Sequence, residues 1–207
     1  MDRREIATRK TQWAQLFGRA IARTGITPNQ ISVLGIGFAL ASGAFFYLAG
    51  HDKSKLYLFW AAACIQLRLL CNMLDGLVAV ENNKKSVYGD LYNEIPDRIE
   101  DILIFVGAGY FIPESSWLGW LMALLAVLTA YLRCLGNALG CKAYFLGPQA
   151  KQHRMFVLTV GAIAQMIFGF ELPILRDTLI FIGVGTVITF IRRLAHIAKE
   201  LKERPSV

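Results

Sequence analysis

Charged residues are scarce in this chain. Asp, Glu, Lys and Arg make up 18% of its 207 residues, against about 25% in an average soluble domain. Apolar residues other than glycine already make up 55%, whereas a soluble domain has about 45–50% with glycine included. This composition argues against a soluble globular protein and against a disordered chain, which needs low hydrophobicity. It predicts a polytopic membrane protein.

Cysteine is also sparse, with four residues and no Cys-x-x-Cys pair. Each of the four lies in or beside an apolar run, so we expect small core residues rather than a disulfide framework or a metal site. The net charge is +7, which in a soluble protein would suggest nucleic acid as a partner. Here the basic residues flank long apolar runs, so they indicate contact with membrane lipids and no nucleic-acid partner.

Long apolar runs, by contrast, are abundant. A bilayer core about 30 Å thick is crossed by about 20 helical residues. The sequence contains six runs that suit such spans, and it predicts an all-α integral membrane fold with six transmembrane helices. The predicted spans cover residues 28–50, 56–80, 89–112, 117–140, 155–170 and 172–191.

Basic residues fall mostly on one side of these predicted spans. Of the 22 Lys and Arg residues, sixteen lie before the first span, after the sixth, or in the connections after the second and fourth. Three lie on the opposite side, namely Lys53 and Lys55 in the connection after the first span and Arg176 at the start of the sixth. By the positive-inside rule this asymmetry predicts that both termini are cytoplasmic, together with the polar site described below. We expect the membrane to be a bacterial inner membrane.

The segment before the first span predicts a further helix. Residues 3–23 place apolar side chains near one face and Arg and Lys on the others, which is typical of an amphipathic helix in the lipid headgroup layer. A solvated helix packed on the protein is the alternative. The predicted organisation is a single membrane domain over residues 1–207, with an interfacial helix (1–25), a six-helix bundle (26–195) and a cytoplasmic tail (196–207).

Polar residues interrupt the apolar pattern where the second predicted span ends and the third begins. Ionisable groups at membrane depth are costly, so a cluster of them indicates a functional site. Asn72 and Asp75 are three residues apart, and Asp90, Glu94 and Asp97 follow at intervals of four and three. Each set therefore shares one helix face. Two antiparallel helices joined by a short loop can turn these faces toward each other.

Such facing side chains would form an oxygen-rich pocket at the cytoplasmic boundary of the membrane. Asn93 lies four residues before Asp97 and adds an amide oxygen to the same face. Carboxylate and amide oxygens suit hard cations such as Mg²⁺, which would be well placed to neutralise a diphosphate. Gly76 and Gly89 would let a ligand approach the backbone closely.

Structural ion pairs are the alternative interpretation of this cluster. Asp97 could pair with Arg68 or Arg98, and we expect Glu100 and Asp101 to be held in this way. The glycines and asparagines that accompany the aspartates favour a ligand-binding role for the rest of the cluster.

A second polar segment lies between the fourth and fifth predicted spans. Lys151 and Arg154, with Arg133 near the end of the fourth span, put three cations on the same side as the carboxylates. They would suit a phosphate on the substrate or a lipid headgroup. An ordinary positively charged cytoplasmic loop is the alternative.

The spacing of the first cluster resembles the signature of the CDP-alcohol phosphotransferase (phosphatidyltransferase) family. That signature is D-x-x-D-G-x-x-A-R, eight residues, and then G-x-x-x-D-x-x-x-D. Asp75, Gly76 and Ala79 match its first part, and Gly89 and Asp97 match its second part with the interval intact. The resemblance extends to the six spans and to the basic N-terminal helix.

The chain departs from this signature at three positions. Asn72 and Asn93 replace two of its four aspartates, and Val80 replaces its arginine. Because the family places its metals on the four acidic positions, the two amides would reduce the formal charge of that set from about −4 to −2. Such a site would hold metal weakly, hold one ion instead of two, or recruit Asp90 or Glu94 as a further ligand.

The resemblance implies a reaction and roles for individual residues. An alcohol hydroxyl attacks the phosphorus of CDP-diacylglycerol that bears the lipid, and CMP leaves. Asp97 would be the general base and a ligand of the Mg²⁺ or Mn²⁺ cofactor. The other metal ligands would be Asn72, Asp75 and Asn93. The residues that would bind the donor are Asn29, Gly76, Ala79, Ser86 and Gly89.

These observations favour a phosphatidyltransferase of phospholipid biosynthesis that acts on a small alcohol. The basic loop leans toward a phosphorylated acceptor such as glycerol phosphate. The Asn substitutions motivate an alternative, a non-catalytic relative that binds a nucleotide-lipid or a partner. A transporter is disfavoured because the polar groups cluster at one membrane face rather than near the midplane. A homodimer is left open.

Overall fold

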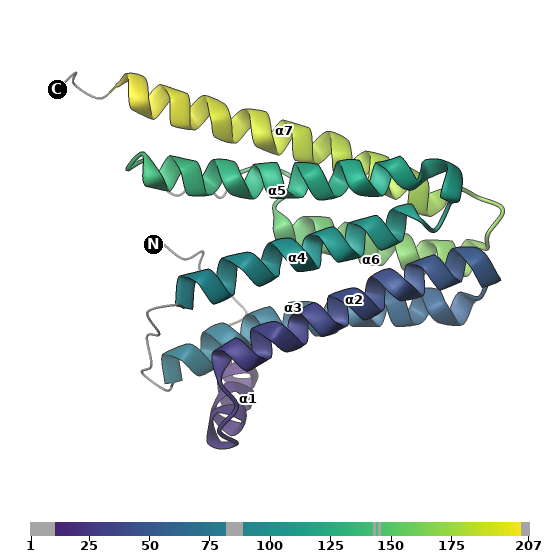
Figure 1. Cartoon of the computed structure of the whole chain (residues 1–207), viewed down its shortest axis with the longest axis horizontal. Coiled ribbons are helices and arrows are strands. Elements are labelled where there is room, and N and C mark those ends of the chain that lie inside the picture. Colours follow the sequence, from purple (N-terminus) through teal and green to yellow (C-terminus); the bar gives the residue numbers. More distant parts are fainter. Residues whose placement is uncertain (1–10, 82–88, 143, 145, 204–207) are drawn as a thin grey trace.

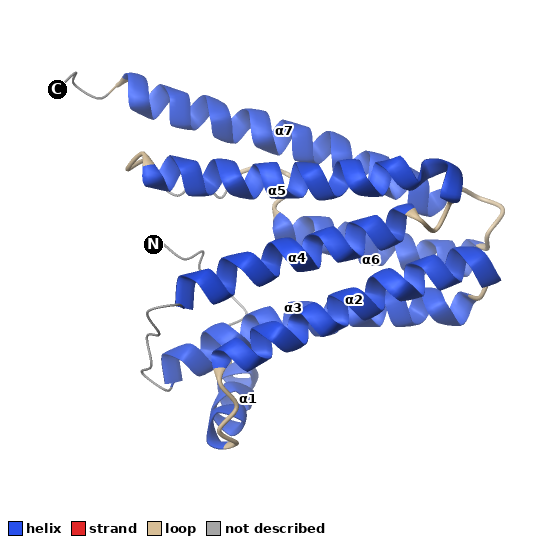
Figure 2. Ribbon diagram, viewed as in Figure 1, coloured by secondary structure: helices blue, strands red, loops and turns tan. Residues whose placement is uncertain are grey.

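Seven α-helices make up the described part of the chain, which covers residues 11–81, 89–142, 144 and 146–203 of a computed structural model (Figure 1). No strand occurs among these residues (Figure 2), so the prediction of an all-α fold is confirmed. The helices are α1 (Gln12–Arg23), α2 (Pro28–Asp52), α3 (Lys55–Glu81), α4 (Gly89–Gly109), α5 (Ser116–Ala138), α6 (Lys151–Phe168) and α7 (Ile174–Lys202), with the 3-10 turn η2 (Pro113–Ser115) before α5.

The helices α2 to α7 run back and forth along the long axis of the molecule, and α1 projects at a steep angle from the side of the bundle at the start of α2 (Figure 1). Helix α2 packs closely against both α3 and α4, α4 packs against α5, and α5 packs against α7. Helix α6 contacts α3 and α7, and α1 contacts α3. The end of α3, the start of α4 and the last turns of α5 and α7 lie at the end of the bundle where α1 lies.

Four of the described helices are long and apolar enough to cross a membrane by length and composition, namely α2, α3, α5 with η2, and α7. Helices α4 and α6 are not among them. Helix α4 carries several charged residues, among them Asp97, Glu100 and Asp101, and α6 has only 18 residues, of which the first four are polar. The composition of the bundle supports an integral membrane protein, and the six spans stay a prediction.

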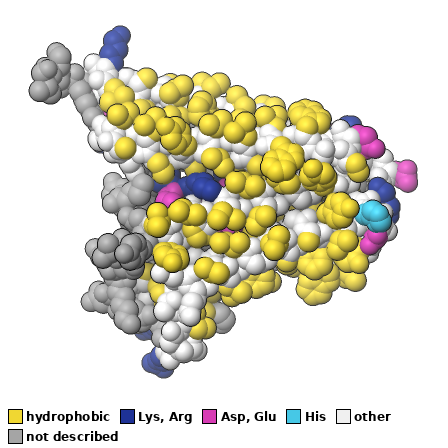
Figure 3. All heavy atoms as spheres, viewed as in Figure 1, with side chains coloured by type: hydrophobic (Ala, Val, Ile, Leu, Met, Phe, Trp, Pro, Cys, Tyr) yellow, Lys and Arg dark blue, Asp and Glu magenta, His cyan; other side chains and the backbone are white. Residues whose placement is uncertain are grey.

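Apolar side chains fill the inside of the bundle and also cover its outside. Phe46 and Phe105 are fully buried between helices, whereas Phe156 and Phe181 are 65% and 62% exposed. Figure 3 shows hydrophobic side chains spread along the outer surface of the helices. Exposed apolar surface of this extent is unfavourable in water and is expected where lipid surrounds a protein.

The start of α2 is fixed by local hydrogen bonds. The backbone N–H of Gln30 donates to the Thr27 hydroxyl at 3.3 Å, and the Thr27 N–H donates to the Gln30 side chain at 2.9 Å. Pro28 occupies the first helical turn, where its missing N–H is not needed. This capping box sets the direction in which α2 enters the bundle, and therefore where Asn29 and Ser32 lie.

Helices α2 and α4 approach each other at glycine. A Cβ atom on Gly43 would lie 2.5 Å from the backbone oxygen of Leu103 in α4. Only glycine allows this close approach. The contact holds α4, which carries most of the charged residues, firmly against α2.

Two helix boundaries differ from the sequence-based expectation. Helix α6 begins at Lys151 rather than near residue 155, and in Figure 1 its start lies part of the way along the bundle. Helix α7 continues past Ile191 to Lys202, so the expected tail is helical through residue 202. Of the expected interfacial helix, the structure describes α1, and residues 1–10 lie outside the described part.

The extension of α7 is held by the connection that follows α5. Ile197 lies against Gly136, and the Glu200 carboxylate accepts hydrogen bonds from the Lys142 N–H at 3.2 Å and from the Tyr144 hydroxyl at 2.7 Å. The hydrogen bond to Glu200 raises the pKa of the Tyr144 phenol, because it stabilises the protonated form. These contacts keep the last turns of α7 helical beyond the apolar run.

Candidate active site

Charged and amide side chains from four helices meet inside the bundle. We call this group the polar cluster. Figure 3 shows acidic and basic side chains set back between hydrophobic ones on one face of the molecule. Its described members are Arg68, Asn72 and Asp75 of α3, Glu94, Asp97, Arg98, Glu100 and Asp101 of α4, Arg133 of α5, and Lys151 and Arg154 of α6.

The innermost part of the polar cluster is an ion network around Arg68. Its guanidinium donates to Glu100 at 2.5 Å and to Asp101 at 2.8 Å. Arg154 binds the other oxygen of Asp101 at 3.0 Å. The side chains of Arg68, Glu100 and Asp101 are at most 3% exposed, and charges at such depth are tolerated only when they are paired. The expectation that Glu100 and Asp101 form structural ion pairs is confirmed.

The aspartate of α3 is held by a residue of α2. The Ser32 hydroxyl donates to Asp75 Oδ2 at 2.9 Å, and Asp75 is 5% exposed. One turn earlier in α3, the Asn72 side-chain amide donates to Glu100 Oε2 at 3.2 Å, which fixes the orientation of that amide. Asn29 lies one turn before Ser32 in α2, so the two residues share a helix face.

Asp97, the expected general base, is bound by the first residue of α6. The Lys151 ammonium donates to Asp97 Oδ1, and Arg98 lies 3.8 Å from the other carboxylate oxygen. The Asp97 side chain is 15% exposed. The sequence had also suggested an ion pair between the Asp97 carboxylate and Arg68. In the structure Arg68 contacts the backbone oxygen of Asp97 at 3.5 Å. The start of α6 inside the bundle explains why Lys151 reaches this position.

Glu94 has two cationic partners. Its carboxylate accepts from Arg133 at 2.7 and 2.5 Å, one distance for each oxygen, and it also accepts from Arg98. The sequence suggested Glu94 as a replacement metal ligand. In the structure this carboxylate instead bridges two guanidinium groups, which neutralise its charge.

The three expected phosphate-binding cations differ in how deeply they lie. The side chains of Arg133 and Lys151 are 12% and 25% exposed. Arg154 is 5% exposed, and besides Asp101 it donates to the Gln149 backbone oxygen at 3.0 Å. Its guanidinium therefore takes part in holding the start of α6 inside the bundle, whereas the other two lie closer to the surface of the cluster.

The remaining expected site residues lie near the facing ends of α3 and α4. Gly76 is buried and Ala79 is half-buried in the last turns of α3. Gly89, Asp90 and Asn93 belong to the first turns of α4, and their side chains lie outside the described part of the structure. Ser86 also lies outside the described residues.

The donor atoms available to a metal are oxygens of a few residues. Among the described side chains, no three of the His, Cys, Asp and Glu type converge so that they could hold an ion. Asp75 and Asp97 supply carboxylate oxygens, and Asn72 supplies an amide oxygen. These are the donor types that hard cations prefer, and the Lys151 ammonium bound to Asp97 shows that a cation is accepted there. The donor atoms of the described residues are therefore of the type that binds a divalent cation, although only two of these residues carry a negative charge.

Sequence reasoning missed two contacts of the cluster. Ser32 was not expected as the partner of Asp75, although its place one turn after Asn29 puts it on the same face of α2. Lys151 was expected to bind phosphate and not Asp97. Neither contact leaves a local signal, because the partners are far apart in the sequence.

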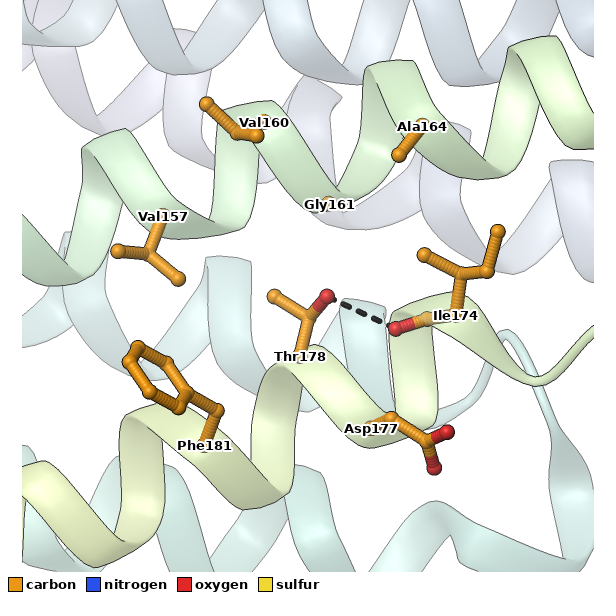
Figure 4. Close-up of a pocket in the computed structure, with 8 residues that line it drawn as sticks. All are labelled: Val157, Val160, Gly161, Ala164, Ile174, Asp177, Thr178 and Phe181. Carbon is orange, nitrogen blue, oxygen red and sulfur yellow. Dashed lines mark hydrogen bonds between the residues drawn. The ribbon is translucent and has the colours of Figure 1, made fainter.

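A groove on the outer surface between α6 and α7 is a different kind of feature. It has a volume of about 410 Å³ and is lined by apolar residues such as Val157, Val160 and Phe181 (Figure 4). Of its polar residues, Thr178 donates its hydroxyl to the Ile174 backbone oxygen at 2.8 Å, and Asp177 is exposed. The lining offers no cation for a phosphate, so the polar cluster is the candidate active site.

Comparisons with known proteins point to the same family as the polar motif of α3 and α4. Residues 25–191 match the CDP-alcohol phosphatidyltransferase family. An archaetidylinositol phosphate synthase of Pyrococcus horikoshii is 22% identical over 202 residues, which cover 96% of this chain and 97% of that protein. The inner membrane protein YnbA of Escherichia coli is 28% identical over 144 residues, which cover 69% of this chain and 70% of that protein.

Two crystal structures of Mycobacterium tuberculosis phosphatidylinositol phosphate synthase share the fold. The structure with CDP-DAG bound has a TM-score of 0.77 and 22% identity, and the match covers 93% of this chain and 98% of the other. The complex with manganese and citrate has a TM-score of 0.76 and 23% identity over 88% of each chain. Since the family match covers most of the sequence and includes the polar motif, this chain belongs to the CDP-alcohol phosphatidyltransferase family.

Proposed function

We propose that this protein transfers a phosphatidyl group from CDP-diacylglycerol to a small phosphorylated alcohol and releases CMP, as a step of phospholipid biosynthesis. The observation that carries the proposal is the polar cluster, in which Asp75 of α3 and Asp97 of α4 stand at the family spacing. A hydrogen bond from Asn72 to Glu100 joins these two helices. Inositol phosphate is the first acceptor to consider, because two similar proteins are named as synthases of inositol phosphate lipids. Glycerol phosphate is the second.

In this proposal all six helices α2 to α7 cross the membrane as one domain. The start of α2 and the end of α7 lie toward the same end of the bundle, which supports an even number of crossings. The charges of α4 and α6 are paired within the polar cluster, which lowers the cost of placing these helices in lipid. The excess of Lys and Arg supports a cytoplasmic site and cytoplasmic termini, with α1 in the headgroup layer. The likeness to an inner membrane protein supports a bacterial inner membrane.

The reaction is a displacement at phosphorus. The oxygen of the acceptor hydroxyl attacks the phosphorus that carries diacylglycerol, and the bond from this phosphorus to the oxygen bridging to CMP breaks. CMP leaves with the electron pair of that bond. The carboxylate of Asp97 takes the hydroxyl proton, and Lys151 and Arg98 orient this carboxylate through their contacts with its two oxygens.

The residues of α3 and α4 would hold the cofactor, Mg²⁺ or Mn²⁺. The ligands proposed are Asn72, Asp75, Asn93 and Asp97, with Asp90 as a further candidate. When bound, the divalent cation would neutralise negative charge on the diphosphate of the donor. Ser32 orients Asp75 and Glu100 orients Asn72, so the ligands are positioned by their own hydrogen bonds.

The substrates would approach the cluster from two sides. The donor nucleotide would lie over the facing ends of α3 and α4, against Asn29, Gly76, Ala79, Ser86 and Gly89. The phosphate of the acceptor would bind Arg133 and Lys151, whose side chains are partly exposed. Arg154 supports this side by holding the first turn of α6 on Asp101.

The test is an acceptor screen with the purified full-length protein and labelled CDP-diacylglycerol. With Mg²⁺ or Mn²⁺ present, we expect CMP release and a labelled phospholipid with inositol phosphate, and a weaker or no reaction with unphosphorylated inositol. Glycerol phosphate, serine and inositol are the matched alternatives. Absence of CMP release with every alcohol and metal would contradict the proposal and favour a non-catalytic relative that binds the nucleotide-lipid.

A further inference from the structure

We infer that the ammonium group of Lys151 takes the place of a second metal ion, so that the site holds a single divalent cation. The inference rests on the proposed function, since it concerns the ligands assigned there. It specifies the number of metal ions per chain and gives Lys151 a role as the fixed cation of the site.

The charge of the proposed ligand set suits one divalent cation rather than two. Two divalent cations held side by side repel each other, and carboxylate ligands offset this repulsion. Asn72 and Asn93 contribute amide oxygens without charge. The carboxylates of Asp75 and Asp97 together match the charge of one divalent cation, and the four positions that match the family signature hold no further carboxylate for a second ion.

The other described carboxylates of the polar cluster are already bound to guanidinium groups. Glu94 bridges Arg98 and Arg133. Glu100 and Asp101 are buried on Arg68. The described side chains accordingly contain no group of three acidic, His or Cys residues that could hold an ion. No described carboxylate therefore replaces the two that the asparagines remove.

Lys151 lies where it can supply a fixed positive charge to the proposed ligand set. Its ammonium donates to Oδ1 of Asp97, the residue that completes the proposed ligand set. Lys151 is the first residue of α6, and Arg154 three residues later is bound to Asp101 and to the Gln149 backbone oxygen. The start of α6 is thus anchored, and the ammonium is delivered to Asp97 as a preorganised positive charge.

The consequence is a competition between Lys151 and the metal for one carboxylate. Removing the ammonium charge should strengthen metal binding, because Asp97 loses a competing cation. The same change should slow CMP release, because the site loses a fixed positive charge that orients Asp97 and binds the phosphate of the acceptor. A side chain with a merely structural role would weaken metal binding and activity together when it is removed.

The experiment counts bound Mn²⁺ by electron paramagnetic resonance on the purified full-length protein in detergent, without substrate. We expect one Mn²⁺ per chain at saturation. For Lys151→Gln we expect Mn²⁺ to bind about tenfold more tightly, while CMP release falls. Lys151→Arg should keep the wild-type affinity for Mn²⁺, since the charge remains.

Lys142→Gln is the matched control, because Lys142 is an exposed lysine in the same α5–α6 connection. It should leave both measurements unchanged. Two Mn²⁺ ions per wild-type chain would overturn the inference and leave the proposed function standing, as would unchanged or weaker Mn²⁺ binding in Lys151→Gln. Absence of both Mn²⁺ binding and CMP release in the wild-type protein would overturn the proposed function as well.

Discussion

The guanidinium of Arg68 in α3 lies 2.8 Å from the carboxylate of Asp101 in α4, and the two side chains are 0% and 3% exposed. Arg68 also binds Glu100, and Arg154 of α6 binds Asp101 from the other side. One buried ion network thus joins three of the four helices that carry the candidate active site, namely α3, α4 and α6. The helices can carry charges at this depth because each charge has a partner.

This relationship predicts a large loss of stability when Arg68 is removed. Arg68→Met should lower the free energy of unfolding by about 3–5 kcal/mol, because Glu100 and Asp101 would keep buried charges without their main partner. Denaturant unfolding in detergent measures this change. The matched control is Arg176→Met, which removes an exposed pair with Asp177 and should cost at most about 1 kcal/mol. Equal effects of the two substitutions would contradict the account of the network.

Asp97→Asn should abolish turnover while leaving the fold intact. The amide has the size of the carboxylate and its oxygen accepts the hydrogen bond of Lys151, but it cannot take a proton. We expect CMP release to fall by at least about 100-fold, with little change in the thermal unfolding midpoint. Asp177→Asn on the exposed first turn of α7 serves as a control and should keep full activity. Unchanged turnover in Asp97→Asn would remove Asp97 as the base.

The two asparagines of the motif should respond differently to replacement by aspartate. Asn93→Asp should retain metal binding and strengthen it, since a negative ligand is added. Asn72→Asp should cost about 1–3 kcal/mol of stability in the metal-free protein, because the Asn72 amide donates to Glu100 at 3.2 Å and a carboxylate there would face a second carboxylate. Mn²⁺ titration and denaturant unfolding measure the two effects. Complete loss of metal binding in Asn93→Asp would show a differently organised site.

The close approach of α2 and α4 gives a prediction about packing. A Cβ atom at Gly43 would meet the backbone oxygen of Leu103 at 2.5 Å, whereas a Cβ atom at Gly37 of the same helix has nothing within 4 Å. Gly43→Ala should therefore destabilise the protein by about 1–3 kcal/mol. Gly37→Ala should be neutral or slightly stabilising, because alanine favours helix. Similar unfolding curves for both variants would contradict this packing of the two helices.

The helices and the motif were largely predictable from the sequence, because apolar runs and helical spacing are local patterns. The role of Glu100 and Asp101 was predictable for the same reason, since charges that continue into an apolar run need partners. The partners themselves were not predictable. Helical spacing shows that Glu94 and Asp97 share a face of α4. The packing of α5 and α6 decides that Glu94 meets Arg133 and that Asp97 meets Lys151.

The length of α7 was underestimated for a related reason. After Ile191 the sequence becomes basic and polar, which is typical of a solvated tail. The structure keeps this segment helical because Ile197 packs against Gly136 and Glu200 binds the connection after α5. These contacts join residues about 60 positions apart, and periodicity within one segment does not reveal them.

The central claim is that the polar cluster uses a divalent cation to release CMP from CDP-diacylglycerol. The most direct measurement compares CMP release by the wild-type protein and by Asp75→Asn, each with Mn²⁺ and after its removal by a chelator. We predict release by the wild-type protein with Mn²⁺ and inositol phosphate, and loss of release after chelation or in Asp75→Asn. Release that persists in Asp75→Asn, or that is independent of the metal, would contradict the claim.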